Sequence, residues 1–319
     1  MKKMIINSRN NIVSENRTQS EIQKGWGECL SPLVSVCCIT YNHASYIKDA
    51  IDSFLMQETN FAFEILIHDD ASTDETTQII LDYAEQYPDI IKPVIQDENQ
   101  YLKCSLINPR FLFPKAVGKY IALCDGDDYW TDRSKLDKQV GFLENNPDYV
   151  ITYTDCVPVD KNGVINADFK GARRDLESVE LQKSPPIYTL TTCFRNVLDE
   201  VPLDLMSARY GDLVLWSRLG HYGKGKYMEN IQPAIYRVHG QGVHSRTSKK
   251  QKFSMGFITY AALFAYYKRI SNDQLSNYFL REAFKFSLRS MGVTGMFGVI
   301  FHLMRRYFEK VKSFIKNKL

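Results

Sequence analysis

The sequence predicts an α/β fold: a Rossmann-like, mostly parallel sheet flanked by helices, with a helical appendage at the C-terminus. Three observations lead to this prediction. The 319 residues are 44% hydrophobic and 24% charged, which is typical of a globular protein. Continuous β-branched runs, as found in strands buried on both faces, begin at residue 33. These runs alternate with segments of helical periodicity at the spacing of βαβ units.

The first half of the chain carries most of this alternation. Strands are predicted at 33–40, 63–68, 92–96 and 119–124. Helices are predicted at 45–57, 71–88 and 134–147. Ser72 and Glu75 have the spacing of a capping box at the start of the second helix, and Pro147 ends the third.

The second half of the chain is less regular. Strand-like runs lie at 149–160 and 187–194, a short helix is expected at 211–223, and a helical, aromatic-rich region begins near 253. The expected divisions, in order, are a polar lead-in of weak structure (1–30), an α/β domain (31–248) and a helical C-terminal region (249–319).

The net charge of +3 excludes general electrostatic binding to nucleic acid. Residues 301–319 alone hold six Lys or Arg and one Glu, a net of +5, so the other 300 residues sum to −2. Large apolar residues alternate with these cations, a pattern typical of a basic amphipathic helix. We expect contact with an anionic membrane surface there, and packing on the domain or oligomerisation through residues 253–267 are the alternatives.

Cysteine usage and hydropathy indicate a cytoplasmic protein. Peripheral attachment to the inner face of the cell membrane is compatible with both. The seven cysteines include no C-x-x-C pair, which favours free thiols over disulfides or zinc ligands. Residues 1–25 lack the apolar core of a secretory signal, and the apolar run at 291–304 is too short to cross a bilayer.

Acidic residues gather where two predicted strands end. Asp69 and Asp70 follow the second strand, and Asp125, Asp127 and Asp128 follow the fourth in "LCDGDDYW". Ligands of parallel sheets bind at the carboxyl ends of strands. Crowded carboxylates raise one another's pKa, and a divalent cation such as Mg²⁺ or Mn²⁺ relieves the repulsion. A D-x-D pattern also occurs in ordinary solvated turns, so this alternative stays open at this point.

A series of motifs narrows the interpretation. The segments "VSVCCITYNHASYIKDAIDSFLMQ", "FEILIHDDASTD", "GKYIALCDGDDYW", "GDLVLW" and "YRVHGQGVHS" occur in this order from about residue 33 to 245. Together they resemble the family 2 glycosyltransferases of the GT-A fold. The chain looks most like the bacterial members that build O-antigen, capsule and related surface polysaccharides from nucleotide sugars.

The resemblance implies a donor site. Tyr41 and Asn42 match the residues that line the nucleotide pocket, and Asp69 matches the strand-end residue that contacts uracil. Asp125 matches the ribose-contacting residue of D-x-D and Asp127 the metal ligand, for Mn²⁺ or Mg²⁺. Asp128, the third carboxylate of the motif, is expected to contribute to the donor site without binding the metal directly.

The resemblance also implies catalytic and C-terminal site residues. Asp212 takes the place of the catalytic base, although Gly211 stands where the family often has Glu. His239 matches a residue that approaches the metal or the diphosphate. Arg237 and His244 lie nearby and are candidates for binding the donor.

Other polar residues receive weaker assignments. The family often has an Arg that touches phosphate, and this chain offers only Arg110 or Lys115 for that role. His43 and His68 are expected to be structural.

These residues imply a metal-dependent, inverting glycosyltransferase of the hexosyl or N-acetylhexosaminyl type. The expected donor is a UDP-sugar, and the expected acceptor is a hydroxyl of a growing surface glycan on a lipid carrier. One alternative is a sugar nucleotidyltransferase, which usually has a Gly-rich, basic phosphate loop. The other is a non-catalytic nucleotide-sugar-binding or scaffold protein, which would need no catalytic base.

Overall fold

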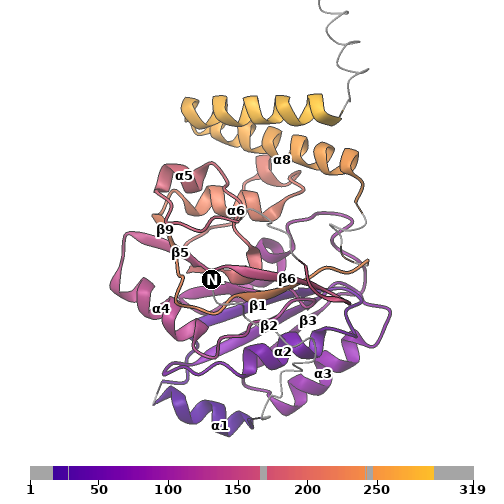
Figure 1. Cartoon of the computed structure of the whole chain (residues 1–319), viewed down its shortest axis with the longest axis vertical. Coiled ribbons are helices and arrows are strands. Elements are labelled where there is room, and N and C mark those ends of the chain that lie inside the picture. The colour runs from indigo at the N-terminus through magenta and orange to yellow at the C-terminus, as the bar shows by residue number, and fades with distance from the viewer. Residues whose placement is uncertain (1–16, 28, 166–170, 241, 243–246, 291–319) are drawn as a thin grey trace, which may run out of the picture.

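A seven-stranded sheet with the strand order β3-β2-β1-β4-β8-β5-β9 forms the centre of the computed structural model (Figure 1). The structure describes residues 17–27, 29–165, 171–240, 242 and 247–290. The strands of this sheet are β1 (Val34–Thr40), β2 (Phe63–Asp69), β3 (Ile91–Ile95), β4 (Tyr120–Leu123), β5 (Tyr149–Tyr153), β8 (Cys193–Arg195) and β9 (Lys224–Tyr227).

The first four strands are parallel, as predicted. β1 pairs with β2 and with β4, so that Val34 lies opposite Phe63 on one side and Tyr120 on the other. β8 then runs antiparallel to both β4 and β5. The carboxyl ends of β1, β2 and β4 therefore meet at one edge of the sheet, which brings the acidic segments of the sequence together.

Helices cover both faces of this sheet, because alternate residues of its buried strands point to opposite sides. Val36 and Ile65 face one core together with α2 (Ile47–Leu55), α3 (Thr76–Gln86) and α4 (Lys135–Asn145). Cys37 and Leu66 face a second core with α5 (Ser178–Gln182) and α6 (Gly211–Leu219). Figure 1 shows α2 and α3 below the sheet and α5 and α6 above it.

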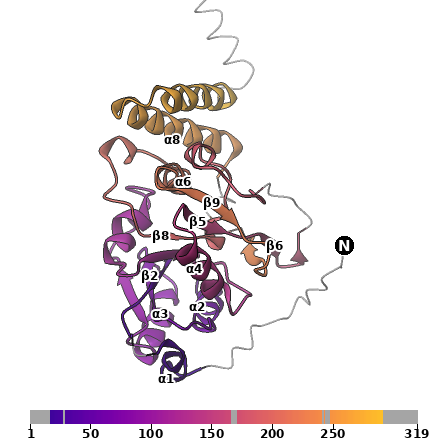
Figure 2. The same cartoon turned by 90° about the vertical axis from the view of Figure 1, so that its left-hand side faces the viewer.

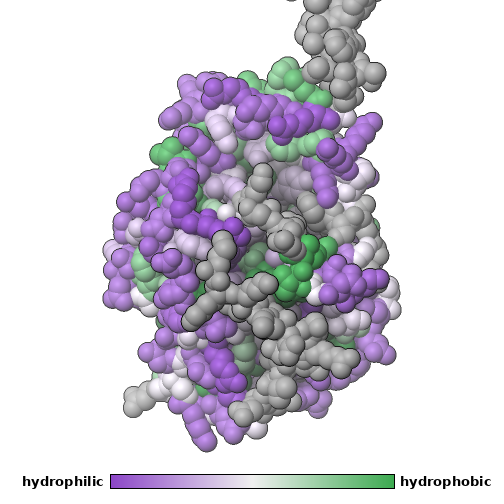
Figure 3. Space-filling view, viewed as in Figure 1, coloured by the Kyte–Doolittle hydropathy of each residue, from purple (hydrophilic) through white to green (hydrophobic). Residues whose placement is uncertain are grey.

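A helical layer extends the second face. α8 (Lys249–Arg269) packs against α6 through a core that includes Val214, Leu263 and Tyr267, and a further helix at 273–290 adds Phe279 to it. Figure 2 shows this layer from the side, at the end of the molecule away from α2 and α3. Its outer surface in Figure 3 is mostly hydrophilic, with separate hydrophobic patches. Among the described residues, no helix combines the length and hydropathy required to cross a membrane.

A smaller sheet with the order β10-β6-β7 lies beside the main one. It consists of β6 (Cys156–Asp160), β7 (Gly163–Val164) and β10 (Ala234–Arg237). The predicted strand at 149–160 is thus split between two sheets, and the Asp155 carboxylate accepts a hydrogen bond from the Cys156 amide at the break (2.9 Å). This small sheet positions the C-terminal site residues.

The remaining short helices are single turns. They are α1 (Gln19–Gln23), η1 (Lys24–Trp26), η2 (Asn108–Leu112), η3 (Phe113–Lys115), η4 (Thr189–Thr191) and η5 (Leu203–Leu205). The prediction of weak structure is wrong for residues 19–26, because Trp26 is buried with its ring centroid 5.3 Å from that of Phe63. The predicted strand at 187–194 is also partly wrong, since η4 precedes β8 there.

The predicted capping box at Ser72 and Glu75 is not formed. α3 begins at Thr76 with Glu75 as its N-cap residue, and the Ser72 hydroxyl instead donates to the Asp69 carboxylate. The same hydroxyl accepts a hydrogen bond from the Asn42 amide (2.8 Å). Tertiary partners at the strand ends therefore replace the local cap that the spacing suggests.

The cysteine prediction agrees with the structure, and the C-terminal prediction falls outside it. All seven cysteines are free thiols, and Cys29 is the exposed one among them. The predicted amphipathic helix at 301–319 and its membrane contact lie outside the described residues. The three predicted divisions of the chain stay a prediction; α8 begins at the boundary expected between the second and third.

Candidate metal and nucleotide site

The acidic segment after β4 forms a tight turn against the end of β1. The Asp128 amide donates to the Asp125 carbonyl (3.1 Å), and the Gly126 amide donates to the Ile39 carbonyl (2.9 Å). A Cβ atom at position 126 would lie 2.8 Å from the Thr40 Cβ. Only glycine allows this approach, which fixes where the three carboxylates lie relative to β1.

β10 brings the C-terminal residues to this turn. The Tyr129 and Ile235 backbones form an antiparallel bridge, and the Arg237 amide donates to the Asp128 carboxylate (2.8 Å). Two residues further on, His239 Nε2 lies 2.9 Å from Asp127 Oδ2. The predicted metal ligands Asp127 and His239 therefore meet, although 112 residues separate them in the sequence.

His43, which the sequence predicted to be structural, lies in the same cluster. Its Nε2 atom lies 3.7 Å from Asp127 Oδ2, and its ring centroid lies 5.9 Å from that of His239. One ligand atom from each of His43, Asp127 and His239 lies within 4.8 Å of the others. Sequence reasoning missed His43 because a single histidine in a strand-end loop carries no ligand spacing; its place directly after Asn42 was the available signal.

Burial and like charge set the electrostatics of the turn. Burial, with the charges of Asp127 and Asp212, raises the pKa of Asp125 to about 7. Burial and the Asp127 charge likewise raise the pKa of Asp128 well above its ordinary value. Burial acts in the same direction on Asp127, but the hydrogen bond from His239 and the nearby His43 lower its pKa overall. Asp127 is therefore the carboxylate of the three that holds its negative charge most readily.

Asp212 lies in the first turn of α6 and faces the acidic turn. Burial raises its pKa, and its charge in turn contributes to the raised pKa of Asp125. The predicted base and the predicted ribose-contacting carboxylate are thus electrostatic neighbours. A carboxylate whose pKa is raised by burial is better suited to accept a proton near neutral pH than an ordinary exposed one.

The predicted nucleotide residues at the ends of β1 and β2 lie in one linked pair of loops. Asn42 has a left-handed backbone with φ of 55°, and its Oδ1 accepts a hydrogen bond from the Thr73 amide (2.7 Å). Asp69 is fully buried and accepts hydrogen bonds from the Ser72 amide (3.2 Å) and the Thr77 hydroxyl. Tyr41, by contrast, is 41% exposed and offers a ring to a ligand.

The Arg237 side chain is held within the site. Its guanidinium pairs with Asp49, donates to the Asp127 carbonyl (3.1 Å) and lies over the Tyr129 ring (4.5 Å to the centroid). Its charge is thus already matched by a carboxylate. These contacts hold the acidic turn in place. Binding of the nucleotide sugar by this side chain stays a prediction. His244 lies outside the described residues.

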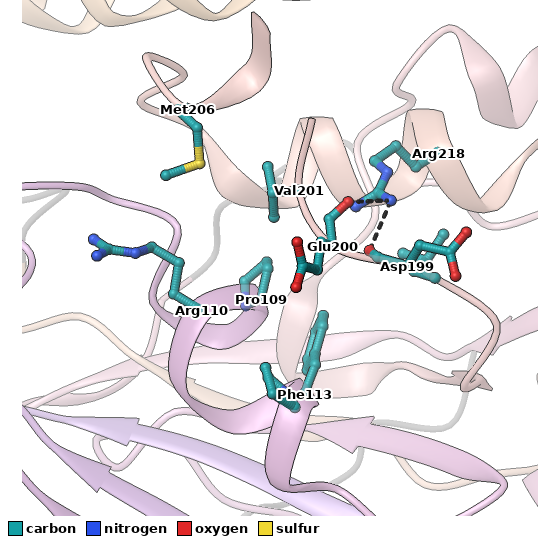
Figure 4. Close-up of a pocket in the computed structure, with 10 residues that line it drawn as sticks. Pro109, Arg110, Phe113, Asp199, Glu200, Val201, Met206 and Arg218 are labelled. Carbon is teal, nitrogen blue, oxygen red and sulfur yellow. Dashed lines mark hydrogen bonds between the residues drawn. The ribbon is translucent and has the colours of Figure 1, made fainter. Parts of the chain in front are cut away.

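Two separate cavities adjoin these elements. One cavity, of about 700 Å³, is lined by Tyr46, Lys161, Arg237 and His239 and opens beside the cluster of candidate ligands. The other, of about 370 Å³, lies between η2 and the segment before η5. Figure 4 shows Arg110 and Arg218 on opposite sides of this second cavity, where Arg218 donates to the Asp199 and Glu200 carbonyls. Arg110 therefore lines a different cavity from His239.

The side-chain oxygen and nitrogen atoms of this cluster suit a divalent transition metal. One carboxylate and two imidazoles converge, and oxygen and nitrogen atoms of this kind bind Mn²⁺, Fe²⁺, Co²⁺ or Zn²⁺. The side chains of His43, Asp127 and His239 are 14%, 19% and 12% exposed, so the cluster is reachable from solvent. Asp127 and His239 are the two of these three residues that the motifs predicted as metal ligands.

Proteins with similar sequences align with about two thirds of this chain. An uncharacterized protein of Mycobacterium tuberculosis is 34% identical over 225 residues, which are 69% of this chain and 63% of that protein. This chain thus spans less than two thirds of that relative's length. The putative glycosyltransferase EpsE of Bacillus subtilis is 34% identical (65% of this chain, 73% of EpsE). The Escherichia coli UDP-Glc:alpha-D-GlcNAc-diphosphoundecaprenol beta-1,3-glucosyltransferase WfaP is 28% identical (68% and 82%).

Solved structures share the fold. TarS of S. aureus in complex with UDP has a TM-score of 0.54 at 20% identity, covering 80% of this chain and 72% of that chain. The mannosyltransferase PcManGT from Pyrobaculum calidifontis, in complex with GDP-Man and Mn2+, has a TM-score of 0.55 at 16% identity, covering 88% and 86%. The family model described as glycosyl transferase family 2 matches residues 35–198. The chain belongs to glycosyl transferase family 2, with the GT-A fold that its motifs predicted.

Proposed function

We propose that this protein is a metal-dependent, inverting glycosyltransferase that moves a sugar from a nucleotide sugar to a hydroxyl of a bacterial surface glycan. The observation that carries the proposal is the meeting of Asp127 with the two imidazoles of His43 and His239. Asp212, the candidate base, is half-buried and close enough for its charge to raise the pKa of Asp125 in the same turn.

A metal bound to Asp127 and His239 would neutralise the nucleoside diphosphate as the sugar–phosphate bond breaks. Asp212 accepts the proton of the acceptor hydroxyl, which attacks the anomeric carbon from the face opposite the leaving group. Asp125 and Asp69 hold the ribose and the base of the donor, while Tyr41 and Asn42 line its pocket. One displacement inverts the configuration, and no nucleophile of the protein is needed.

The relatives suggest the donor and acceptor classes. TarS is crystallised with UDP, and WfaP carries UDP-Glc and a diphosphoundecaprenol acceptor in its name. By analogy we propose a UDP-sugar donor of the hexosyl or N-acetylhexosaminyl type and a lipid-linked acceptor. A lipid-linked acceptor would place the protein at the inner face of the cell membrane.

The test is release of nucleoside diphosphate from UDP-, GDP- and dTDP-sugars, with Mn²⁺, with Mg²⁺ and with chelator. We expect metal-dependent release from one donor, which falls at least about 100-fold in Asp127→Ala. Asp82→Asn, on the exposed surface of α3, is the control for loss of a carboxylate charge. Release that is equal in chelator and unaffected by Asp127→Ala would contradict the proposal.

The Asp212→Asn variant distinguishes an enzyme from the non-catalytic alternative. If Asp212→Asn binds the donor and metal like the unmodified protein and loses transfer to an acceptor, the protein is an enzyme that uses this base. If the unmodified protein binds a nucleotide sugar by calorimetry but never releases its diphosphate with any acceptor, it is a binding module.

A further inference from the structure

We infer that His43 is a third protein ligand of the metal, so that the site has two imidazoles and one carboxylate and prefers Mn²⁺ or another transition metal to Mg²⁺. The inference deepens the proposed function and rests on it. It concerns a residue outside the D-x-D turn, in the loop that follows β1.

The His43 ring points at the cluster without a hydrogen bond to explain its orientation. Its Nε2 atom is 3.7 Å from Asp127 Oδ2, beyond hydrogen-bond range, whereas the His239 contact at 2.9 Å is within it. No described residue donates to or accepts from His43 Nε2, the ring atom nearest to Asp127. This nitrogen is therefore free to bind a metal that Asp127 and His239 also hold.

The separations suit ligands that share one ion. Atoms about 2.1 Å from an octahedral ion lie about 3 Å apart when adjacent and about 4 Å apart when opposite. The distances from Asp127 Oδ2 to His239 Nε2 and His43 Nε2 are 2.9 and 3.7 Å. The three atoms therefore need only small shifts to surround a metal, with the remaining positions facing solvent and the donor.

The surroundings hold His43 in this place. Its backbone amide donates to the Thr76 hydroxyl (2.8 Å), and the next amide, of Ala44, donates to Asp74 (3.1 Å). The Tyr46 ring packs against both imidazoles, with centroids 6.2 Å from His43 and 4.7 Å from His239. A loop tied to α3 and an aromatic ring shared by both histidines give a preorganised pair of nitrogen ligands.

Two imidazoles change which metal is favoured. Mg²⁺ prefers oxygen ligands, while nitrogen ligands favour transition metals in the order Mn²⁺ < Fe²⁺ < Co²⁺ < Ni²⁺. A site with Asp127 and His239 alone would offer one imidazole and would discriminate less against Mg²⁺. The His43 ligand thus predicts that Mn²⁺ binds the full chain more tightly than Mg²⁺ in the presence of UDP.

The experiment is a Mn²⁺ titration of the full chain with UDP, followed by electron spin echo spectroscopy of the bound ion. We expect couplings to two imidazole nitrogens, one of which disappears in His43→Asn and the other in His239→Asn. We also expect His43→Asn to weaken Mn²⁺ binding at least about tenfold. His43→Asp, which supplies an oxygen ligand instead, is expected to narrow the preference for Mn²⁺ over Mg²⁺.

His221→Asn is the matched control, because His221 bonds to the Tyr267 hydroxyl (3.0 Å) in the helical layer and is not among the three clustered ligands. If His43→Asn keeps both nitrogen couplings and the Mn²⁺ affinity of the unmodified protein, the inference is wrong while the proposed function stands. If the unmodified protein binds no Mn²⁺ with UDP, the inference is also wrong, and donor release in chelator then decides the proposed function separately. His43→Gln replaces His43→Asn if the latter does not fold.

Discussion

Two acidic segments follow β2 and β4, the strands on either side of β1, and the Asp70 and Asp125 carboxylates within them differ in their number of protein hydrogen-bond donors. After β2, the Asp70 carboxylate accepts hydrogen bonds from the Gln100 amide (2.7 Å) and the Tyr101 amide (3.0 Å), and it faces His68 Nε2 (3.2 Å). After β4, no hydrogen bond from a described residue reaches the Asp125 carboxylate. Protein groups thus satisfy the Asp70 carboxylate, whereas the Asp125 carboxylate is left to be completed from outside.

The difference lies in the number of protein donors around each carboxylate. Hydrogen-bond donors replace the water that Asp70 loses on burial. Burial and the charge of Asp127 instead raise the pKa of Asp125 and Asp128, an effect that a divalent cation would reverse.

The largest expected effect is on activity at the open cluster. Asp127→Asn should lower donor release at least about 100-fold, because the metal loses its carboxylate ligand. The urea midpoint without metal should change little, since the substitution removes the repulsion of Asp125 and Asp128 together with the attraction between Asp127 and the two imidazoles. A variant that loses activity only in proportion to its loss of folded protein would remove the contrast between the two segments.

Asp70 should behave in the reverse manner. Asp70→Ala leaves two partly buried backbone amides without acceptors, and we expect the free energy of unfolding to fall by about 2 kcal/mol. The measurement is urea denaturation followed by circular dichroism. Asp70→Asn, which keeps one acceptor oxygen, should lose about half as much. Full stability in Asp70→Ala would show that the loop at 97–107 does not depend on this carboxylate.

Gly126 tests whether the turn must approach β1 closely. Gly126→Ala places a methyl group 2.8 Å from the Thr40 Cβ and 2.9 Å from the Ile47 side chain. We expect a loss of about 2 kcal/mol in unfolding free energy and weaker metal binding, because the turn has to move. Gly141→Ala, where a Cβ has open space in α4, is the control and should be neutral or slightly stabilising.

Lys135 extends the comparison to a buried cation. Its ammonium donates to the side-chain Oε1 of Gln139 (2.6 Å) and lies over the Trp130 ring (4.3 Å to the centroid), and burial lowers its pKa to about 8. The unfolded chain keeps this proton up to about pH 10 while the folded chain releases it near pH 8. Stability therefore rises with pH in this range, because the unfolded state binds more protons.

The measurement is the unfolding free energy of the unmodified protein minus that of Lys135→Met. This difference should grow by about 1–2 kcal/mol between pH 7.5 and 9.5. A difference that stays constant across this range would mean that the buried lysine does not titrate there.

The sequence alone determined much of this protein. Apolar runs and helical periods predicted the parallel core of β1, β2 and β4, because those elements bury nearly all of their side chains. The order of motifs identified the family and predicted that Asp127, His239 and Asp212 share one site. Asp127 follows a predicted strand and Asp212 begins a predicted helix, whereas His239 was matched by its motif alone.

Only the tertiary structure decided the rest. The route of β10 past the acidic turn brought His239 to Asp127, and the loop after β1 added His43, which carries no ligand spacing of its own. The structure also assigned Ser72 to the strand ends instead of a helix cap and buried Trp26 in the core. Such outcomes depend on contacts between distant segments, and a local pattern records only which residues are available to make them.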